Sequence, residues 1–291
     1  MYHRENRLSG AEIPSPLFAI WSVLDDGALI QPNPLLATVR SLFLLGVTLV
    51  LIGPYLLLFR LAAARQALNG LWQAAAVRAC GLDVEVTGEA VATARRLTVC
   101  NHVSYLDIPV LASLMPEATF IAKAEVKSWP VFGILARLAR TAFIRREPTQ
   151  AAAQRTQLQR RLDDGDSLIL FAEGTSSDGT GVLPFKSALF SLAEQVPGDE
   201  GFVIQPVSIA YTRLADGRPL IGGLEDFYAW HGDMTLGPHL GRVLGLRGAK
   251  VRVHFHEPIA VEAGMTRKAL ANVTHAKVSE GVQRARSYWL G

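Results

Sequence analysis

The chain has 291 residues, of which 49% are hydrophobic and only 19% are charged, and its mean hydropathy is +0.22. This composition excludes a chain that is disordered over most of its length, and it is apolar enough to favour contact with a membrane. The formal net charge of +3 is small and the arginines are scattered, so a nucleic-acid-binding protein is not favoured.

The N-terminal part is predicted to contain an irregular tail, residues 1–36, and a membrane-anchoring helical segment, residues 37–80. The tail has no clear period and holds four prolines: Pro14, Pro16, Pro32 and Pro34. No charged residue occurs from Ser41 to Phe59, and as a helix this run is about 28 Å long, against a hydrocarbon core of roughly 30 Å. It predicts a spanning or deeply embedded helix, and a buried core helix is the alternative. Gly53-Pro54 predicts a kink or a turn back toward the same side.

Arginines beside this run bear on its orientation. Arg60, Arg65 and Arg78 follow it and favour the cytoplasmic side for the rest of the chain, whereas Arg40 on the other flank weighs against that assignment. We therefore expect a membrane protein, in a bacterial inner membrane, whose C-terminal domain faces the cytoplasm.

Residues 81–291 are predicted to form one α/β domain. Strand-like and helix-like pieces alternate after Gly81, which predicts a mixed sheet flanked by helices. The predicted strands are 82–86, 97–101, 119–123, 141–146, 167–171, 202–212 and 250–258, and the predicted helices are 104–115, 149–165 and about 266–289. The last helix is basic and amphipathic, so it either lies on lipid or packs with a solvated face.

The stretch NHVSYLD follows the second predicted strand and holds His102 and Asp107 five residues apart. Within a regular helix these side chains would point roughly 140° apart, so contact between them requires an irregular turn. A carboxylate that accepts the proton of one ring nitrogen leaves the other nitrogen basic at neutral pH, which suits a general base. The spacing by itself also fits a purely structural histidine.

The stretch FAEGT supplies a second group of candidates directly after a predicted strand. Glu173 stands where open α/β sheets bind their ligands, Gly174 allows close approach of the backbone, and Thr175 adds a hydroxyl. The alternative is a plain turn with a solvated glutamate.

Two further stretches follow or contain predicted strands. TAFIRR ends in Arg145 and Arg146, which either hold a phosphate or remain ordinary surface charges. In QPVSIAY, Pro206 interrupts a strand that otherwise looks central, which makes structural sense if the proline shapes a pocket wall.

Taken in order, NHVSYLD, AFIRR, FAEGT and QPVSIAY resemble the four blocks of the 1-acylglycerol-3-phosphate acyltransferase family of membrane-bound glycerolipid acyltransferases. The blocks run from Asn101 to Tyr211, and the N-terminal apolar anchor is similar to the family's layout. The resemblance implies that residues 81–291 are an acyltransferase domain with His102 as general base and Asp107 as its orienting partner. It further implies direct transfer of an acyl group from acyl-CoA or acyl-carrier protein to a lysolipid, first of all 1-acylglycerol 3-phosphate, which gives phosphatidate.

The resemblance also implies which residues bind the substrates. Arg146 matches the acceptor-binding arginine, with Arg145 beside it, and Glu173 with Gly174 and Thr175 matches the acceptor-binding block. Lys186 in PFKSALF resembles a basic position that meets the acceptor or the thiol donor. The family chemistry needs no metal and no cofactor other than the acyl donor, and it involves no nucleic acid.

Departures from the family pattern leave the acceptor open. Ala172 and Ser176 stand where proline and arginine are frequent, and Arg140 stands where glycine usually opens the second block. The segment FYAWHGDMTLGPHL resembles bacterial members that include enzymes acylating lyso-ornithine lipid, which lacks phosphorus. Lyso-ornithine lipid is therefore the alternative acceptor, and a non-catalytic lipid-binding membrane protein is a third hypothesis.

The remaining histidines and the cysteines are interpreted structurally. His254 and His256 share one face of a strand but have no evident third ligand, and the stretch around His231 reads as a loop turn. Cys80 and Cys100 are too few for a disulfide framework.

Overall fold

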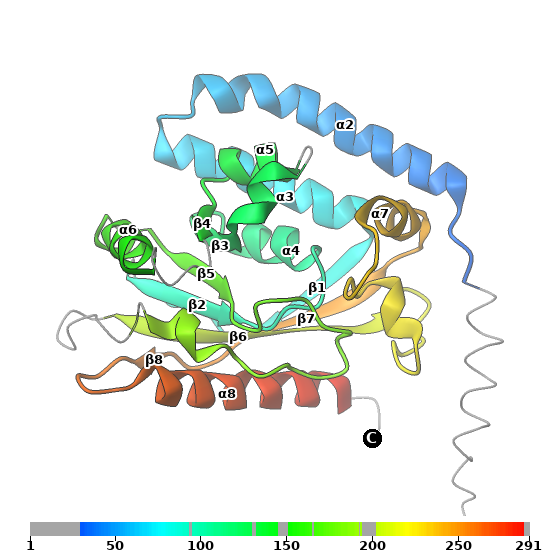
Figure 1. The fold of residues 1–291 in the computed structure, drawn as a ribbon. Helices are drawn as coiled ribbons and strands as arrows, with labels where there is room; N and C mark the ends of the chain where they lie inside the picture. The colour runs from blue at the N-terminus through cyan, green and yellow to red at the C-terminus, as the bar shows by residue number, and fades with distance from the viewer. Residues whose placement is uncertain are drawn as a thin grey trace, which may run out of the picture.

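A computed structural model describes residues 30–92, 95–129, 132–144, 151–164, 166–191, 193 and 202–287. Its centre is one eight-stranded sheet (Figure 1). The strands are β1 (Leu82–Thr87), β2 (Arg96–Cys100), β3 (Thr119–Lys123), β4 (Ala142–Ile144), β5 (Leu168–Phe171), β6 (Val203–Leu214), β7 (Ala249–Phe255) and β8 (Ile259–Ala260). Their order is β1-β7-β6-β2-β5-β3-β4, with β8 paired to β6. The pairs of β6 with β7 and β8 are antiparallel and the others are parallel, which confirms the predicted mixed sheet.

Helices cover both faces of this sheet (Figure 1). They are α2 (Pro34–Leu57), α3 (Ala62–Ala79), α4 (Asp107–Leu114), α5 (Phe132–Leu138), α6 (Ala151–Asp163), α7 (Leu236–Gly245) and α8 (Arg267–Ser287), with short 3-10 turns η1 (Ala124–Ser128), η3 (Ser187–Ser191) and η5 (Leu224–Phe227). Helices α3 and α4 pack together on one side, and α8 packs against β6 on the other. The C-terminal helix is therefore a packed helix, with Leu270, Val278 and Val282 buried.

The central strands are apolar on both faces because both faces are covered. Along β2 and β5, Leu97, Val99 and Leu168 belong to the core that includes residues of α6 and α8. Cys100 and Ile169 belong to the opposite core, which includes residues of α3 and α4. This explains why the fifth strand is an unbroken hydrophobic run and why every residue of the second strand is buried, Arg96 and Thr98 included.

Pro206 lies within β6, and the predicted strand over residues 202–212 is confirmed. Pro206 pairs in register with Val99 of β2, and its carbonyl oxygen accepts a hydrogen bond from the His256 backbone at 3.0 Å. The strand continues to Leu214, and a pocket wall shaped by the proline stays a prediction.

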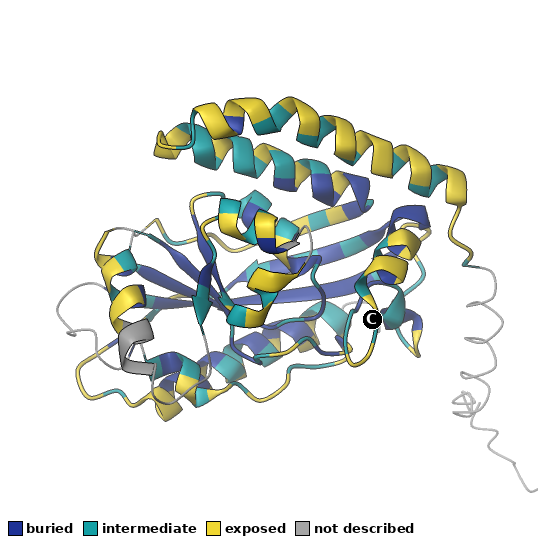
Figure 2. Cartoon of the chain, turned by 45° about the horizontal axis from the view of Figure 1, so that its top comes forward, coloured by how far each residue is buried: buried dark blue, intermediate teal, exposed yellow. Residues whose placement is uncertain are grey.

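Helix α2 carries the apolar run and is long and apolar enough to cross a membrane, with a mean hydropathy of 2.3 in its most apolar window. None of that window is buried, which contradicts the alternative of a buried core helix (Figure 2). Pro54 lies inside the helix, and the chain turns back only after Leu57, not at Gly53-Pro54. Exposed large apolar side chains on α2 are Leu35, Val39, Leu42, Phe43, Leu45, Leu49, Val50, Leu56 and Leu57.

Polar contacts near both ends attach α2 to the α/β domain. Near its start, the Arg40 guanidinium donates to the carbonyl oxygens of Leu244 (3.2 Å) and Leu246 (2.5 Å) at the C-terminal end of α7. Near its end, the Tyr55 hydroxyl donates to the Leu138 carbonyl at 2.5 Å. The helix therefore lies along the domain, with α3 beside it (Figure 1). Residues 1–29 of the predicted tail lie outside the described residues.

Candidate active site

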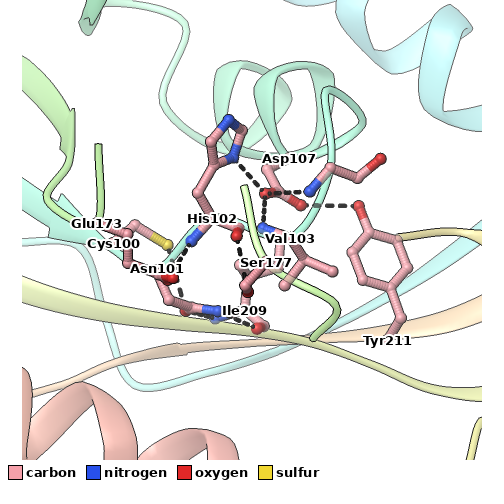
Figure 3. A network of polar contacts seen from close by, with 10 residues as sticks. Cys100, Asn101, His102, Val103, Asp107, Glu173, Ser177, Ile209 and Tyr211 are labelled. Carbon is pink, nitrogen blue, oxygen red and sulfur yellow. Dashed lines mark hydrogen bonds and ion pairs between the residues drawn. The ribbon is translucent and has the colours of Figure 1, made fainter. Parts of the chain in front are cut away.

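The parallel pairing of β2 with β5 brings two of the predicted blocks together. Cys100 and Phe171 are opposite each other at the carboxyl ends of these strands. His102 and Glu173 each lie two residues further on, so they lie side by side at the same edge of the sheet. The His102 backbone N–H donates to Glu173 Oε1 at 2.8 Å (Figure 3).

The loop between β2 and α4 folds around the Asp107 carboxylate. Oδ2 of Asp107 accepts hydrogen bonds from His102 Nδ1 at 2.8 Å, from Val103 N at 2.7 Å and from Ser104 N at 3.0 Å. These bonds keep the loop non-helical, so α4 begins at Asp107 and not at Ser104 as predicted. The predicted irregular turn and the contact between the two side chains are confirmed.

This contact defines which ring nitrogen is basic. Because a carboxylate only accepts hydrogen bonds, Nδ1 of His102 carries the proton and Nε2 keeps a lone pair. The imidazole is stacked on Phe171, with ring centroids 4.0 Å apart and planes 13° apart, and 18% of the side chain is exposed. The ring is thus fixed on two sides, and the arrangement suits proton abstraction from a hydroxyl.

Polar groups that the sequence analysis missed complete the network. The Tyr211 hydroxyl donates to Oδ1 of Asp107 at 2.9 Å (Figure 3). Asn101 extends the pairing of β2 with β6, because its side chain accepts from Ile209 N and donates to Ile209 O, both at 2.9 Å. Both side chains are buried, and Asn101 directly follows β2 while Tyr211 lies within β6. A polar group in or beside an apolar strand was the available sequence signal.

Backbone contacts from two other segments hold the same loop. The carbonyl oxygen of His102 accepts from Ser177 N at 2.9 Å, and that of Val103 accepts from Trp230 N at 3.0 Å. Ser177 follows the FAEGT block, and Trp230 belongs to the FYAWHGDMTLGPHL segment. Both segments therefore border the histidine.

Glu173 is only 1% exposed, and both of its carboxylate oxygens are used within the protein. Oε1 accepts from His102 N, and Oε2 accepts from Leu183 N at 3.1 Å. Burial raises the pKa of Glu173 to about 7, although both backbone N–H groups lower it. Its role in binding the acceptor remains a prediction.

The other residues predicted to contact the substrates differ in their exposure and surroundings. Gly174 has φ of +72°, a conformation that favours glycine, and it turns the chain away from Glu173. Thr175 and Lys186 are exposed, and the Lys186 backbone donates to Ala172 O at 2.8 Å, which places it beside the FAEGT turn. Arg145 and Arg146 lie outside the described residues; β4 ends at Ile144.

Three histidines outside this network have local partners. His254 Nδ1 lies 2.9 Å from Thr87 Oγ1, and His256 Nε2 lies 2.6 Å from Ser208 Oγ. His231 Nε2 lies 3.0 Å from Asp226 Oδ1 in the loop predicted there. Across the described ranges, no group of three or more His, Cys, Asp or Glu side chains is arranged to hold a metal ion.

Comparison with known proteins identifies the family. The family model described as acyltransferase matches residues 83–210. The lyso-ornithine lipid O-acyltransferase of Brucella abortus is 41% identical over 212 residues, which is 72% of this chain and 79% of that protein. The chain belongs to the acyltransferase family.

Two further proteins similar to this acyltransferase are named as acyltransferases of 1-acylglycerol 3-phosphate. The 1-acyl-sn-glycerol-3-phosphate acyltransferase of Neisseria meningitidis is 36% identical over 168 residues, which is 55% of this chain and 58% of that protein. The crystal structure of the 1-acyl-sn-glycerophosphate acyltransferase PlsC from Thermotoga maritima has a TM-score of 0.61 at 20% identity, and the match covers 86% of this chain and 96% of that one. The fold of the acyltransferase is therefore that of PlsC, and the sequence-based assignment to this family is confirmed.

Proposed function

We propose that this acyltransferase transfers a fatty acyl group from a thioester to the free hydroxyl of a lysolipid, with His102 as the general base. The observation that carries the proposal is the 2.8 Å contact between His102 Nδ1 and a fully buried Asp107 carboxylate. That pairing leaves Nε2 available to accept a proton.

The proposed reaction has one transfer step. His102 Nε2 takes the proton of the lysolipid hydroxyl as the oxygen forms a bond to the thioester carbonyl carbon. The carbon–sulfur bond of acyl-CoA or acyl-carrier protein then breaks, and the imidazolium returns the proton to the departing thiolate. The Asp107 carboxylate stabilises the imidazolium while it exists.

Lyso-ornithine lipid is the acceptor that we place first. The Brucella relative of that name is more identical to this chain, and over a larger share of both proteins, than the Neisseria relative. Ser176, where the family pattern often has a cation, fits a headgroup without phosphate. 1-Acylglycerol 3-phosphate, the acceptor that the sequence blocks put first, is the second candidate, and the Neisseria relative supports it.

The exposed apolar face of α2 indicates association with a membrane. Because Arg40 and Tyr55 attach both ends of α2 to the domain, we propose that the helix lies in the interface of one leaflet and does not cross the bilayer. We further propose that the domain faces the cytoplasm at a bacterial inner membrane, as the arginines after the run suggest.

A panel of acceptors tests the reaction and the headgroup together. Protein purified in detergent would receive labelled acyl-CoA with lyso-ornithine lipid or lysophosphatidate, and released thiol and labelled lipid would be measured. We expect faster transfer to lyso-ornithine lipid. A strong preference for lysophosphatidate reverses the order of the two acceptors, and lipid binding without transfer from any donor supports the non-catalytic hypothesis.

Substitution of the histidine tests the assigned base. His102→Ala is expected to lower turnover by about 10²–10⁴-fold, because general-base catalysis contributes that much. His254→Ala is the matched control, since that ring contacts Thr87 away from the site. Near-normal turnover of folded His102→Ala would remove His102 from the proposed role.

A further inference from the structure

Asp107 is held more firmly than an orienting carboxylate needs for the histidine alone. Its Oδ2 oxygen accepts from His102 and from two backbone N–H groups. Its Oδ1 oxygen accepts from Tyr211, a residue 104 positions away on β6. The carboxylate is fully buried, and within the described part of the chain Tyr211 is the side-chain donor that fixes the orientation of Oδ1 (Figure 3).

Tyr211 is itself held in place and remains a donor. It is 5% exposed and stacks on Tyr228, with ring centroids 6.1 Å apart. A register shift in the pairing of β6 with β7 falls between Tyr211 and Arg213, an irregularity of the kind that re-aims side chains next to active sites. Burial and the neighbouring Asp107 charge raise the pKa of Tyr211 well above its ordinary value, so the phenol stays protonated.

We propose that Tyr211 is a positioning residue of the acyl transfer: its hydroxyl fixes Oδ1 of Asp107, and this keeps Oδ2 in line with His102 Nδ1. The inference rests on the proposed role of His102 as general base. Without the phenol, Oδ1 loses its donor among the described residues, and the carboxylate must tilt or admit water to regain one. Either change disturbs the alignment of Oδ2 with His102 Nδ1, while the bonds from Val103 N and Ser104 N keep Oδ2 beside the ring.

The same substitution also alters the charge balance of the pair. A hydrogen bond to Oδ1 withdraws charge from the carboxylate, so its loss makes Asp107 a stronger acceptor for the imidazole proton and favours imidazolium. Several ionisable groups face this region from other elements: Glu173 after β5, Tyr105 in the loop before α4, Cys80 after α3, Cys100 on β2 and Tyr228 after η5. All of them stay in place when Tyr211 changes.

The experiment compares Tyr211→Phe with Tyr228→Phe by steady-state kinetics with labelled acyl-CoA. Tyr228 is the matched control, because it is also fully buried and stacked in the same pair, while its hydroxyl lies near the backbone of Gly248. We expect Tyr211→Phe to lower kcat about 10- to 100-fold, as small misplacements of reacting groups do. We expect KM for both substrates to stay within about twofold, because no binding contact is removed.

The pH profile separates positioning from mere structural support. For Tyr211→Phe the acidic limb of kcat against pH should move to higher pH, whereas Tyr228→Phe should keep the wild-type limb. In an Asp107→Asn background, Tyr211→Phe should add little further loss, because both substitutions act through one carboxylate. Two results would overturn the inference. One is a loss of kcat in the double variant that equals the sum of the two single losses in free energy. The other is a folded Tyr211→Phe variant whose kcat and acidic limb match those of the wild type.

Two controls keep the outcomes separate. If His102→Ala retains turnover, the proposed function fails; if His102→Ala is inactive and Tyr211→Phe is normal, only the present inference fails. Should Tyr211→Phe not fold, 3-fluorotyrosine at position 211 keeps the ring and the hydroxyl and strengthens the donor. The acidic limb should then move to lower pH, and an unmoved limb would contradict the role of Tyr211.

Discussion

The loop around His102 buries polar groups, whereas the outer face of α2 exposes apolar side chains. Around His102, polar groups are removed from water and paired one by one, as for Asp107, Asn101 and Glu173. On α2, large apolar side chains face outward over most of the helix, and its attachments to the α/β domain include hydrogen bonds from Arg40 near one end and Tyr55 near the other. Hydrogen bonds have direction and therefore fix the geometry that catalysis needs, whereas an apolar face needs only area to meet lipid.

The largest effect is expected where the polar network is broken at its centre. Asp107→Asn removes the charge that stabilises imidazolium and allows the wrong tautomer of His102, so kcat should fall by about 10³–10⁴-fold. Steady-state thiol release measures this loss. The exposed Asp233→Asn is the control, and retention of more than a tenth of the activity by folded Asp107→Asn would show that the carboxylate is dispensable.

Membrane binding should depend on the outer face of α2. Leu42, Leu45 and Leu49 are 61%, 54% and 67% exposed and follow helical spacing. Replacing all three with Gln should weaken partition into vesicles of phosphatidylcholine and phosphatidylglycerol by roughly 10²-fold, at about 1 kcal/mol for each side chain, with an unchanged melting temperature. Co-sedimentation measures the partition.

The inner face of the same helix offers the contrast. Leu44 is packed against the core, so Leu44→Gln should lower the melting temperature and leave vesicle binding by the folded protein unchanged. Unaltered binding by the triple variant would disprove the assignment of the outer face to lipid.

Glu173 should make stability depend on pH. Its pKa of about 7 in the folded protein lies above the ordinary value of 4.5, so the folded state retains a proton that the unfolded chain releases in this window. The free energy of unfolding should therefore fall as pH rises from about 4.5 to 7, by on the order of 1–3 kcal/mol from this group. Thermal unfolding in detergent at several pH values should show a flatter profile for Glu173→Gln than for wild type or for the exposed Glu257→Gln, and equal slopes would contradict the buried carboxyl.

The smallest effect is expected at the attachment of α2. Arg40→Gln removes charge-assisted bonds to carbonyl oxygens at the C-terminal end of α7, where a cation is favourable. We expect a loss of about 1 kcal/mol, or roughly 2–4 °C in melting temperature. Arg160→Gln on the exposed face of α6 should change nothing, and a similar drop in both variants would refute a specific role for Arg40.

Local patterns were sufficient to predict the sheet, the apolar helix and the contact between His102 and Asp107. Alternation of strands and helices predicted the mixed sheet, and an uncharged run of membrane length predicted α2. The pair was predictable because both residues lie in one short stretch with a chemical reason to meet. The start of α4 was not, since it depends on backbone bonds to Asp107 that propensity does not report.

Contacts between residues far apart in the chain could not be predicted from the sequence. Glu173 was placed correctly at a strand end, but its bond to the His102 backbone depends on the register of β2 with β5. Tyr211 ends the QPVSIAY stretch, but no role could be predicted for it because its partner Asp107 is 104 positions away. How Pro206 fits into β6 was not predictable either, because a missing N–H breaks a strand only where the sheet needs that donor.

The register between β2 and β5 has a consequence for how this enzyme can change. Cys100 and Phe171 are opposite each other, and the histidine and the glutamate follow at equal offsets. One inserted or deleted residue in either strand would turn one of the two side chains to the other side of the sheet. Point replacements are thus a safer route than length changes for engineering these two strands, whereas surface loops such as Asp216–Pro219 are the natural sites for grafted sequence.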